Sequence, residues 1–170
     1  MRKIPLLRGV KMLGLPIEMY YPALAFLLWA LVVSLIPKEQ IKRLFWISFL
    51  WGYLGSKTFT FLIGEVFHLY AWKHAMPFKF LGAPYWLVLG WTFALMLYFY
   101  FLPETTERYA FPAYLFAFSL VSAALDQIFH QIGLLEYIHW NPFSRFILAL
   151  AWFYGAARHY RYLQAKDALG

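Results

Sequence analysis

Two charged side chains, Lys57 and Asp126, lie near the middle of apolar runs that are long enough to cross a membrane. A charge at the depth of the hydrocarbon costs several kcal/mol unless it is paired or hydrated, so such residues mark function or a specific helix contact. Their depths differ by about one helical turn, and the simplest interpretation is a buried ion pair between two helices. The pattern predicts a membrane protein with a polar interior.

Acid–base chemistry is the reaction type that these runs could support. Glu65 and Asp126 are acidic side chains within the predicted spans, in the same half of the membrane. Hydration of an alkene needs an acid that protonates carbon and a base that activates water, and two carboxylates in different environments can divide these roles. We expect Glu65 to be the acid and Asp126, beside Lys57, the base, with His130 one turn later relaying protons. An isoprenoid cyclase, an isomerase or a proton relay could use the same groups.

A metal site is the alternative use of these residues. The pairs Glu65 with His68 and Asp126 with His130 could supply carboxylate and imidazole ligands for iron or zinc. Di-iron bundles add further Glu ligands from other helices, and the chain has a single Glu-x-x-His motif. We therefore predict no metal and no other cofactor, with His68 as a polar cap at the headgroup level.

Aromatic side chains make up 23% of the chain, and several lie inside the apolar runs. Lipid contact and helix packing explain many of them. The sharper interpretation is an aromatic slot for a long, flat, apolar ligand, in which ring faces stabilise a cationic intermediate. The candidate lining residues are Tyr85, Trp91, Trp140, Asn141 and Trp152.

Composition sets the class of protein. The chain is 63% hydrophobic and 14% charged, whereas a soluble domain has roughly a quarter of its residues charged. The net charge of +7 comes from basic residues scattered at the ends of the apolar runs, a pattern that suits anionic lipid headgroups and not nucleic acid. The chain has no cysteine, so disulfides and thiolate chemistry are excluded.

These residues require helices to position them. Residues 1–18 read as a basic segment on the membrane surface, and five apolar runs follow in a single domain. We predict an all-α bundle of about five transmembrane helices, multi-pass in a bacterial cytoplasmic membrane, with the termini on opposite sides. The Lys and Arg residues other than Lys57 divide seven to seven between the two sides, so they do not orient it. The predicted spans are 20–36, 44–67, 80–102, 110–135 and 143–160.

Part of the chain, about residues 60–155, resembles a known family. The segments that carry the likeness are Gly64-Glu65, Pro77-Phe78, Leu81-Gly82-Ala83-Pro84 with Trp91, and Ala124-Leu125-Asp126 with Trp140 and Trp152. They resemble the membrane carotenoid hydratases that act on acyclic carotenoids, which implies an apolar isoprenoid substrate and a membrane location. A second likeness, through Gly133 to Asn141, is to small uncharacterised multi-span proteins of spore-forming bacteria.

Three functions follow from these patterns. The first is a membrane enzyme that transforms an isoprenoid or carotenoid-like lipid at intramembrane carboxylates. The second is a non-catalytic subunit or assembly factor, whose charges fix helix contacts with membrane protein partners. The third is a small transporter or proton relay, which the odd number of spans and the lack of an inverted repeat disfavour.

Overall fold

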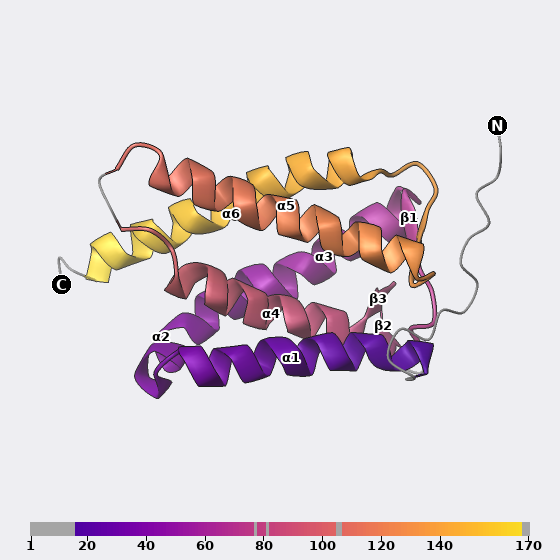
Figure 1. Ribbon diagram of the computed structural model, residues 1–170, viewed down its shortest axis with the longest axis horizontal. Helices are drawn as coiled ribbons and strands as arrows, with labels where there is room; N and C mark the ends of the chain where they lie inside the picture. Colours follow the sequence, from indigo (N-terminus) through magenta and orange to yellow (C-terminus); the bar gives the residue numbers. More distant parts are fainter. Residues whose placement is uncertain (1–15, 77, 81, 105–106, 168–170) are drawn as a thin grey trace.

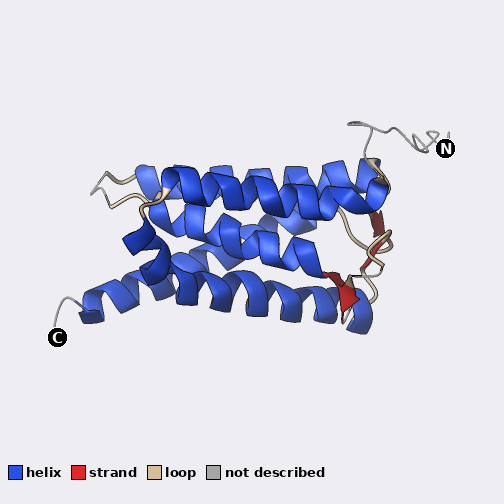
Figure 2. Cartoon of the chain, turned by 90° about the horizontal axis from the view of Figure 1, so that it is seen from below, coloured by secondary structure: helices blue, strands red, loops and turns tan. Residues whose placement is uncertain are grey.

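The computed structural model describes residues 16–76, 78–80, 82–104 and 107–167 (Figure 1). The predicted basic segment 1–18 therefore lies, up to residue 15, outside the described residues. Long helices run side by side along the longest axis of the molecule in both views (Figures 1 and 2). The prediction of an all-α protein is confirmed.

Each predicted apolar run contains a helical segment. A 3-10 turn, η1 (Ile17–Met19), leads into α1 (Tyr20–Leu35). The second long helix is continuous from residue 38 to residue 66 and changes its winding along the way. The later helices are α4 (Tyr85–Tyr100), α5 (Ala110–Gln131) and α6 (Pro142–Asp167). The parts of the second helix are α2 (Lys38–Ser48), η2 (Phe49–Gly55), α3 (Ser56–Thr60) and η3 (Phe61–Val66).

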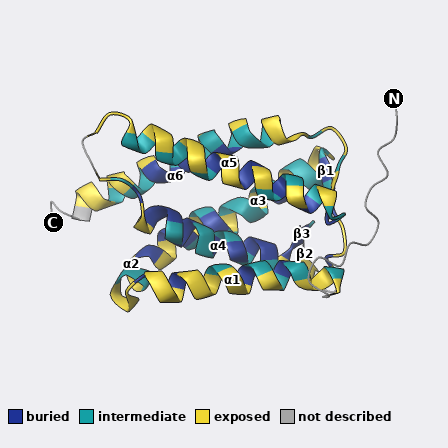
Figure 3. Ribbon diagram, in the orientation of Figure 1, coloured by how far each residue is buried: buried dark blue, intermediate teal, exposed yellow. Residues whose placement is uncertain are grey.

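Two of the described helices are long and apolar enough to cross a membrane, Ile17–Leu35 and Ala110–Gln131. A third, α4, is apolar but shorter. The ends of α1 and α6 that bound the described chain lie at opposite ends of the bundle (Figure 1). Large apolar side chains cover much of the outer surface, for example Trp46 and Phe143, each 72% exposed (Figure 3).

Short strands close one end of the bundle, where the sequence predicted loops and the ends of two spans (Figure 2). Strand β1 (Tyr70–Trp72) pairs antiparallel with β4 (Leu135–Tyr137), so that Trp72 stands opposite Leu135. A hairpin of β2 (Lys79–Phe80) and β3 (Ala83–Pro84) precedes α4, which begins five residues later than predicted. The Tyr21 hydroxyl donates to the carbonyl oxygens of Lys73 and Leu134, at 2.6 and 2.9 Å, and ties α1 to these strands.

The second helix is wound more loosely in two places. Segments η2 and η3 are π-helical, a form that is rare and that often occurs next to functional sites. In η2, a Cβ on Gly52 would lie 2.5 Å from the Cα of Thr92, so the absence of a side chain lets η2 and α4 approach closely. This close contact places α3 against the interior of the bundle.

The helices pack in two pairs, α1 on α4 and α5 on α6, with α4 also against the second helix. Two hydrophobic clusters result. The first, near the α1–α2 turn, is built around Leu44, Leu95, Tyr98, Phe153 and Ala156. The second lies at the strand-capped end and includes Tyr21, Tyr70, Trp72, Phe129 and Leu134.

Candidate functional site

A buried ion pair joins α5 to α6. The Oδ2 atom of Asp126 lies 3.1 Å from Nε of Arg145, and the two side chains are only 9% and 12% exposed. The Nε–H does not point along this contact and has no hydrogen-bond partner, so the attraction is ionic without a well-directed hydrogen bond. The Arg145 guanidinium also lies over the rings of Trp91, at 5.3 Å, and Phe59, at 5.9 Å. These ring faces stabilise the buried cation.

Arg145 is a partner of Asp126 that the sequence did not suggest. The prediction paired Asp126 with Lys57, and the structure places the guanidinium of Arg145 beside its carboxylate. The position of a residue along a helix can be counted from the sequence, but the direction in which its side chain faces cannot. Lys57 follows the π-helical turn η2, which alters the phase of the helix, and its side chain is only partly buried.

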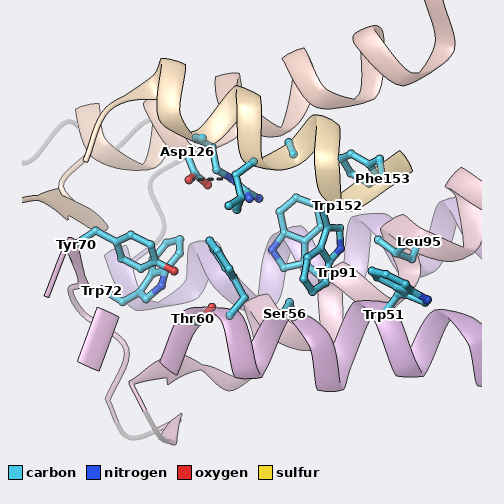
Figure 4. Close-up of a pocket in the computed structure, with 14 residues that line it drawn as sticks. Trp51, Ser56, Thr60, Tyr70, Trp72, Trp91, Leu95, Asp126, Trp152 and Phe153 are labelled. Carbon is cyan, nitrogen blue, oxygen red and sulfur yellow. Dashed lines mark ion pairs between the residues drawn. The ribbon is translucent and has the colours of Figure 1, made fainter. Parts of the chain in front are cut away.

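The ion pair lies on the wall of a cavity inside the bundle (Figure 4). Asp126 comes from α5, Ser56 and Thr60 from α3, and Tyr70 and Trp72 from the strand-capped end. The space open to the centre of a water molecule is about 40 Å³, which is enough for about one to three waters. The remaining lining residues are Trp51, Phe59, Trp91, Leu95, Arg145, Leu148, Ala149, Trp152 and Phe153.

Tyr70 and Trp72 supply polar groups at one end of this cavity. Both side chains are buried, and the indole Nε1 of Trp72 makes no hydrogen bond of regular geometry, although Trp72 and Thr60 both lie close enough to the Tyr70 hydroxyl to lower its pKa. Burial raises the pKa of the Tyr70 hydroxyl to about 12, so it stays protonated and can donate a hydrogen bond. An unsatisfied buried N–H costs about 1–3 kcal/mol, and a ligand or water in the cavity could remove that cost.

Glu65 does not reach the cavity. It lies on η3 with its side chain 44% exposed, 3.5 Å from the ammonium of Lys79, and its carboxylate packs over Gly82. The predicted convergence of Glu65 and Asp126 is therefore not what the structure shows. The two residues share one half of the bundle, but Glu65 points to its outer surface and Asp126 to its interior.

The histidines also lie beside the cavity and not in it. His130 stacks on Tyr137 with ring centroids 4.1 Å apart, and its Nδ1 lies 3.0 Å from the carbonyl oxygen of Leu135. His68 is exposed, in agreement with a polar cap, and its Nδ1 lies 3.3 Å from the carbonyl oxygen of Gly64. Among the described residues, no three His, Asp or Glu side chains converge as metal ligands.

The five residues that were predicted to line an aromatic slot lie in three places: in the wall of the cavity, behind that wall, and away from the cavity. Trp91 and Trp152 line the cavity. Trp140 lies behind it, against Tyr70 and Phe59, with its Nε1 buried and without a partner. Two candidates lie elsewhere: Tyr85 is on the surface, 41% exposed, and Asn141 caps α6 through its Oδ1, which accepts from the Ser144 N–H at 2.8 Å.

Sequence reasoning missed the residues that complete the cavity, notably Thr60, Tyr70 and Trp72. Tyr70 and Trp72 lie just beyond the second apolar run, where aromatic side chains normally mark the membrane interface. The alternating Tyr-Ala-Trp sequence was the one available sign that a strand turns both rings to the same side. No such sign marked Thr60.

Comparisons of the chain with models of known protein families, with curated proteins and with solved structures found no match. The resemblance to carotenoid hydratases stays a prediction from the sequence. The function must be inferred from the cavity.

Proposed function

We propose that this protein is a multi-pass membrane helix bundle that binds the hydroxyl end of an apolar, isoprenoid-type lipid in the cavity beside Asp126 and Arg145. The observation that carries the proposal is the buried, paired carboxylate and guanidinium in an aromatic-walled cavity that also holds an unpartnered indole N–H. Each step from this observation to a hydroxyl-bearing lipid depends on charge, hydrogen bonding or size.

Charge comes first. Asp126 and Arg145 neutralise each other, so a charged head group would leave one buried charge without compensation. The hydrogen-bonding groups narrow the choice further, because Trp72 and Tyr70 can donate while the carboxylate of Asp126 accepts. A hydroxyl both accepts and donates, and it complements this set while remaining neutral.

Size gives the second restriction. A space of about 40 Å³ for the centres of water molecules admits a hydroxyl with its neighbouring carbons, but not a sugar or a phosphodiester head group. The walls of Trp91, Trp152 and Phe59 suit a flat, unsaturated segment next to that hydroxyl. An unsaturated alcohol such as a prenol meets both conditions.

The membrane part of the proposal rests on composition and surface. Two of the described helices could cross a bilayer, and large apolar side chains cover the outside of the bundle. A soluble bundle would place charged residues there. Lipid around the helices would satisfy this surface and would supply the ligand.

Binding is favoured over alkene hydration because the second carboxylate is elsewhere. Glu65 is exposed and paired with Lys79, so the cavity holds one carboxylate, already paired with Arg145. Hydration requires an acid and a base on the same double bond. A binding protein requires neither.

The test uses the full chain in lipid nanodiscs and radiolabelled farnesol, with farnesoic acid and the parent hydrocarbon as competitors. Trp72→Phe and Thr60→Val each remove one polar group from the cavity and keep the ring or the shape. We expect each to weaken farnesol binding by about threefold to tenfold, the value of one hydrogen bond. Farnesoic acid and the hydrocarbon should compete poorly.

Matched controls lie outside the cavity. Trp140 and Thr92 are also buried with an unpartnered N–H or hydroxyl, but neither lines the cavity, so Trp140→Phe and Thr92→Val should bind farnesol as the unmodified protein does. Absence of saturable farnesol binding, or equal losses in the controls, would overturn the proposal.

A non-catalytic membrane subunit is the second candidate. It is favoured by the position of Arg145 between Trp91 and Phe59, which suits a fixed contact between helices. A subunit of this kind would bind no farnesol, and Trp72→Phe would change only its stability. The same nanodisc experiment therefore separates the two functions.

A further inference from the structure

An apolar groove is lined by residues of α1, α4 and α5. In Figure 1, α4 lies between the other two helices. Gly90 of α4 lies in the lining, where an added Cβ would meet Leu28 and Ala25 of α1 at ordinary van der Waals distances of 3.5 Å or more. Ser122, whose hydroxyl has no partner, is the one side chain with a hydroxyl in the lining. The lining residues are Leu24, Leu28, Leu87, Gly90, Trp91, Ala94, Phe118, Val121, Ser122, Leu125, Phe129 and Phe153.

We infer that this groove holds the hydrocarbon chain of the same lipid whose hydroxyl lies in the polar cavity. The inference rests on the proposed function and adds the path of the chain, the number of chains and their length. The occupant is one unbranched or methyl-branched chain, and its terminal end points toward the surrounding bilayer.

Continuity between the two spaces is the first argument. Trp91 and Phe153 line both the polar cavity and the groove. A lipid whose hydroxyl lies beside Arg145 can therefore pass the edge of Trp91 and continue along the other face of that ring. The polar groups lie on the cavity side of Trp91, and almost all of the groove side is apolar. This arrangement matches a lipid whose polar head lies in the cavity and whose apolar tail lies in the groove.

Dimensions favour a single chain over a helix of a partner protein. The space open to the centre of a water molecule is about 100 Å³, compared with about 40 Å³ for the polar cavity. The lining on α5 extends from Phe118 to Phe129, about 16 Å, so this space is narrow along its length and suits one hydrocarbon chain. An α-helix, with a diameter of about 10 Å, is too wide for it.

The same length predicts the chain that fits best. An extended chain advances by about 1.2 Å per atom, so the groove accepts about 13 chain atoms. Farnesol has a main chain of about 12 carbons, of which the first few lie in the polar cavity, so its remaining carbons fill most of the groove. Geraniol, with about 8, enters only the inner part, and geranylgeraniol, with about 16, reaches the outer end. Binding should therefore tighten strongly from geraniol to farnesol and less from farnesol to geranylgeraniol.

Closing the groove tests its role. Val121 lies at the rim and is 59% exposed, so Val121→Trp can place an indole over the groove without disturbing the core. We expect it to weaken farnesol binding in nanodiscs by about tenfold, through lost packing of the chain, and geraniol binding much less. The matched control is Ile128→Trp, on the same helix and 45% exposed but outside the groove, which should bind both alcohols unchanged.

A second measurement does not depend on a variant. Farnesol with a photoreactive diazirine at the end of its chain should label peptides of α1 and α5 that contain Leu28 and Val121. Labelling elsewhere, or equal binding of geraniol and farnesol by the Val121→Trp and unmodified proteins, would overturn the groove assignment. The proposed function would still stand if Trp72→Phe weakened both alcohols, and it would fall with the groove if neither alcohol bound.

Discussion

The side chains pack differently at the two ends of the bundle. Near the α1–α2 turn, Leu44, Leu95 and Ala156 are each at most 1% exposed, and the buried Tyr98 hydroxyl donates to the carbonyl oxygen of Phe153 at 3.0 Å. At the strand-capped end, a charged pair lines a space that the side chains leave open. The first end is filled and nearly all apolar, whereas the second keeps polar groups that water or a ligand must satisfy.

This difference indicates where function lies in a chain that is apolar almost everywhere. Apolar packing alone would close both ends of the bundle, and the first end shows that this sequence can do so. Polar groups that the protein leaves unsatisfied, such as Trp72 Nε1, have a cost that evolution can remove by substitution. Unpartnered hydroxyls also occur elsewhere, at Ser48 and Thr92, but among the described residues the buried charged pair beside a cavity lies at the strand-capped end, and this is the physical reason to place binding there.

The largest loss of stability is expected when one charge is removed from the strand-capped end. Arg145→Leu leaves the Asp126 carboxylate buried without a cation and should lower the free energy of unfolding by about 3–5 kcal/mol. The double variant Asp126→Leu with Arg145→Leu should recover much of that loss, because no unpaired charge remains. Chemical unfolding in detergent micelles, followed by circular dichroism, measures all three proteins.

An exposed ion pair provides the control. Lys73 and Glu136 lie 2.6 Å apart, but their side chains are 48% and 55% exposed, so Glu136→Gln should change the stability by less than about 1 kcal/mol. If Arg145→Leu cost no more than Glu136→Gln, the Asp126–Arg145 pair would not be the buried contact described above. Additive losses in the double variant would contradict the pairing.

The next largest loss of stability is expected at the filled end, where an added methyl group would overlap a neighbouring helix. At Gly52 an added Cβ would lie 2.5 Å from the Cα of Thr92, which belongs to the backbone of α4 and cannot turn aside as a side chain can, so Gly52→Ala must push η2 away from α4. We expect a loss of about 1–3 kcal/mol, the usual cost of overpacking. Gly90→Ala is the control, because its Cβ would find ordinary van der Waals distances of 3.5 Å or more, and it should have little effect on stability. Equal losses for the two variants would refute the close contact.

The sequence predicted the helices of this fold well. Long apolar runs bounded by Pro37 and by Asn141-Pro142 located helix ends that the structure confirms within a few residues. The strands were missed because each is only two or three residues long, too short for an alternating pattern to stand out from the apolar runs beside it. The hairpin β2–β3 explains why α4 begins at Tyr85 and not at residue 80.

The site was predicted in part, and the reason is geometric. Depth along a helix can be counted from the sequence, and it placed Asp126, Trp91 and Trp152 correctly in one interior region. Rotation about the helix axis cannot be counted when apolar residues surround the whole helix, as in the second span. The predicted role of Glu65 depended on that rotation, and Glu65 lies within the π-helical segment η3, downstream of the first such segment, η2.

Alkaline pH offers a milder way to test one residue of the strand-capped end. Burial raises the pKa of Tyr70 from 10.0 to about 12, so between these values the folded protein binds a proton that the unfolded chain has lost. The contribution of this residue to stability should therefore fall as the pH rises from 10 to 12, by about 1.4 kcal/mol at pH 11. Tyr70→Phe should remove this part of the decline, which unfolding curves between pH 9 and 12 would reveal. An equal decline in the variant and the unmodified protein would contradict the buried position of the Tyr70 hydroxyl.

The smallest expected effect decides whether Asn141 belongs to the cavity or only to the start of α6. Its Oδ1 accepts hydrogen bonds from the N–H and hydroxyl of Ser144, at 2.8 and 3.2 Å, and Pro142 follows it as the first helical residue. Asn141→Ala removes this cap and should cost about 1 kcal/mol, whereas Asn141→Asp keeps an accepting oxygen and should cost less. Both variants should bind farnesol with the affinity of the unmodified protein, since Arg145 lies one turn further along α6 and remains held by Asp126. Thermal unfolding and farnesol binding, measured on the same nanodisc samples, check both points. A loss of binding in Asn141→Asp at full stability would return Asn141 to the ligand site that the sequence first suggested.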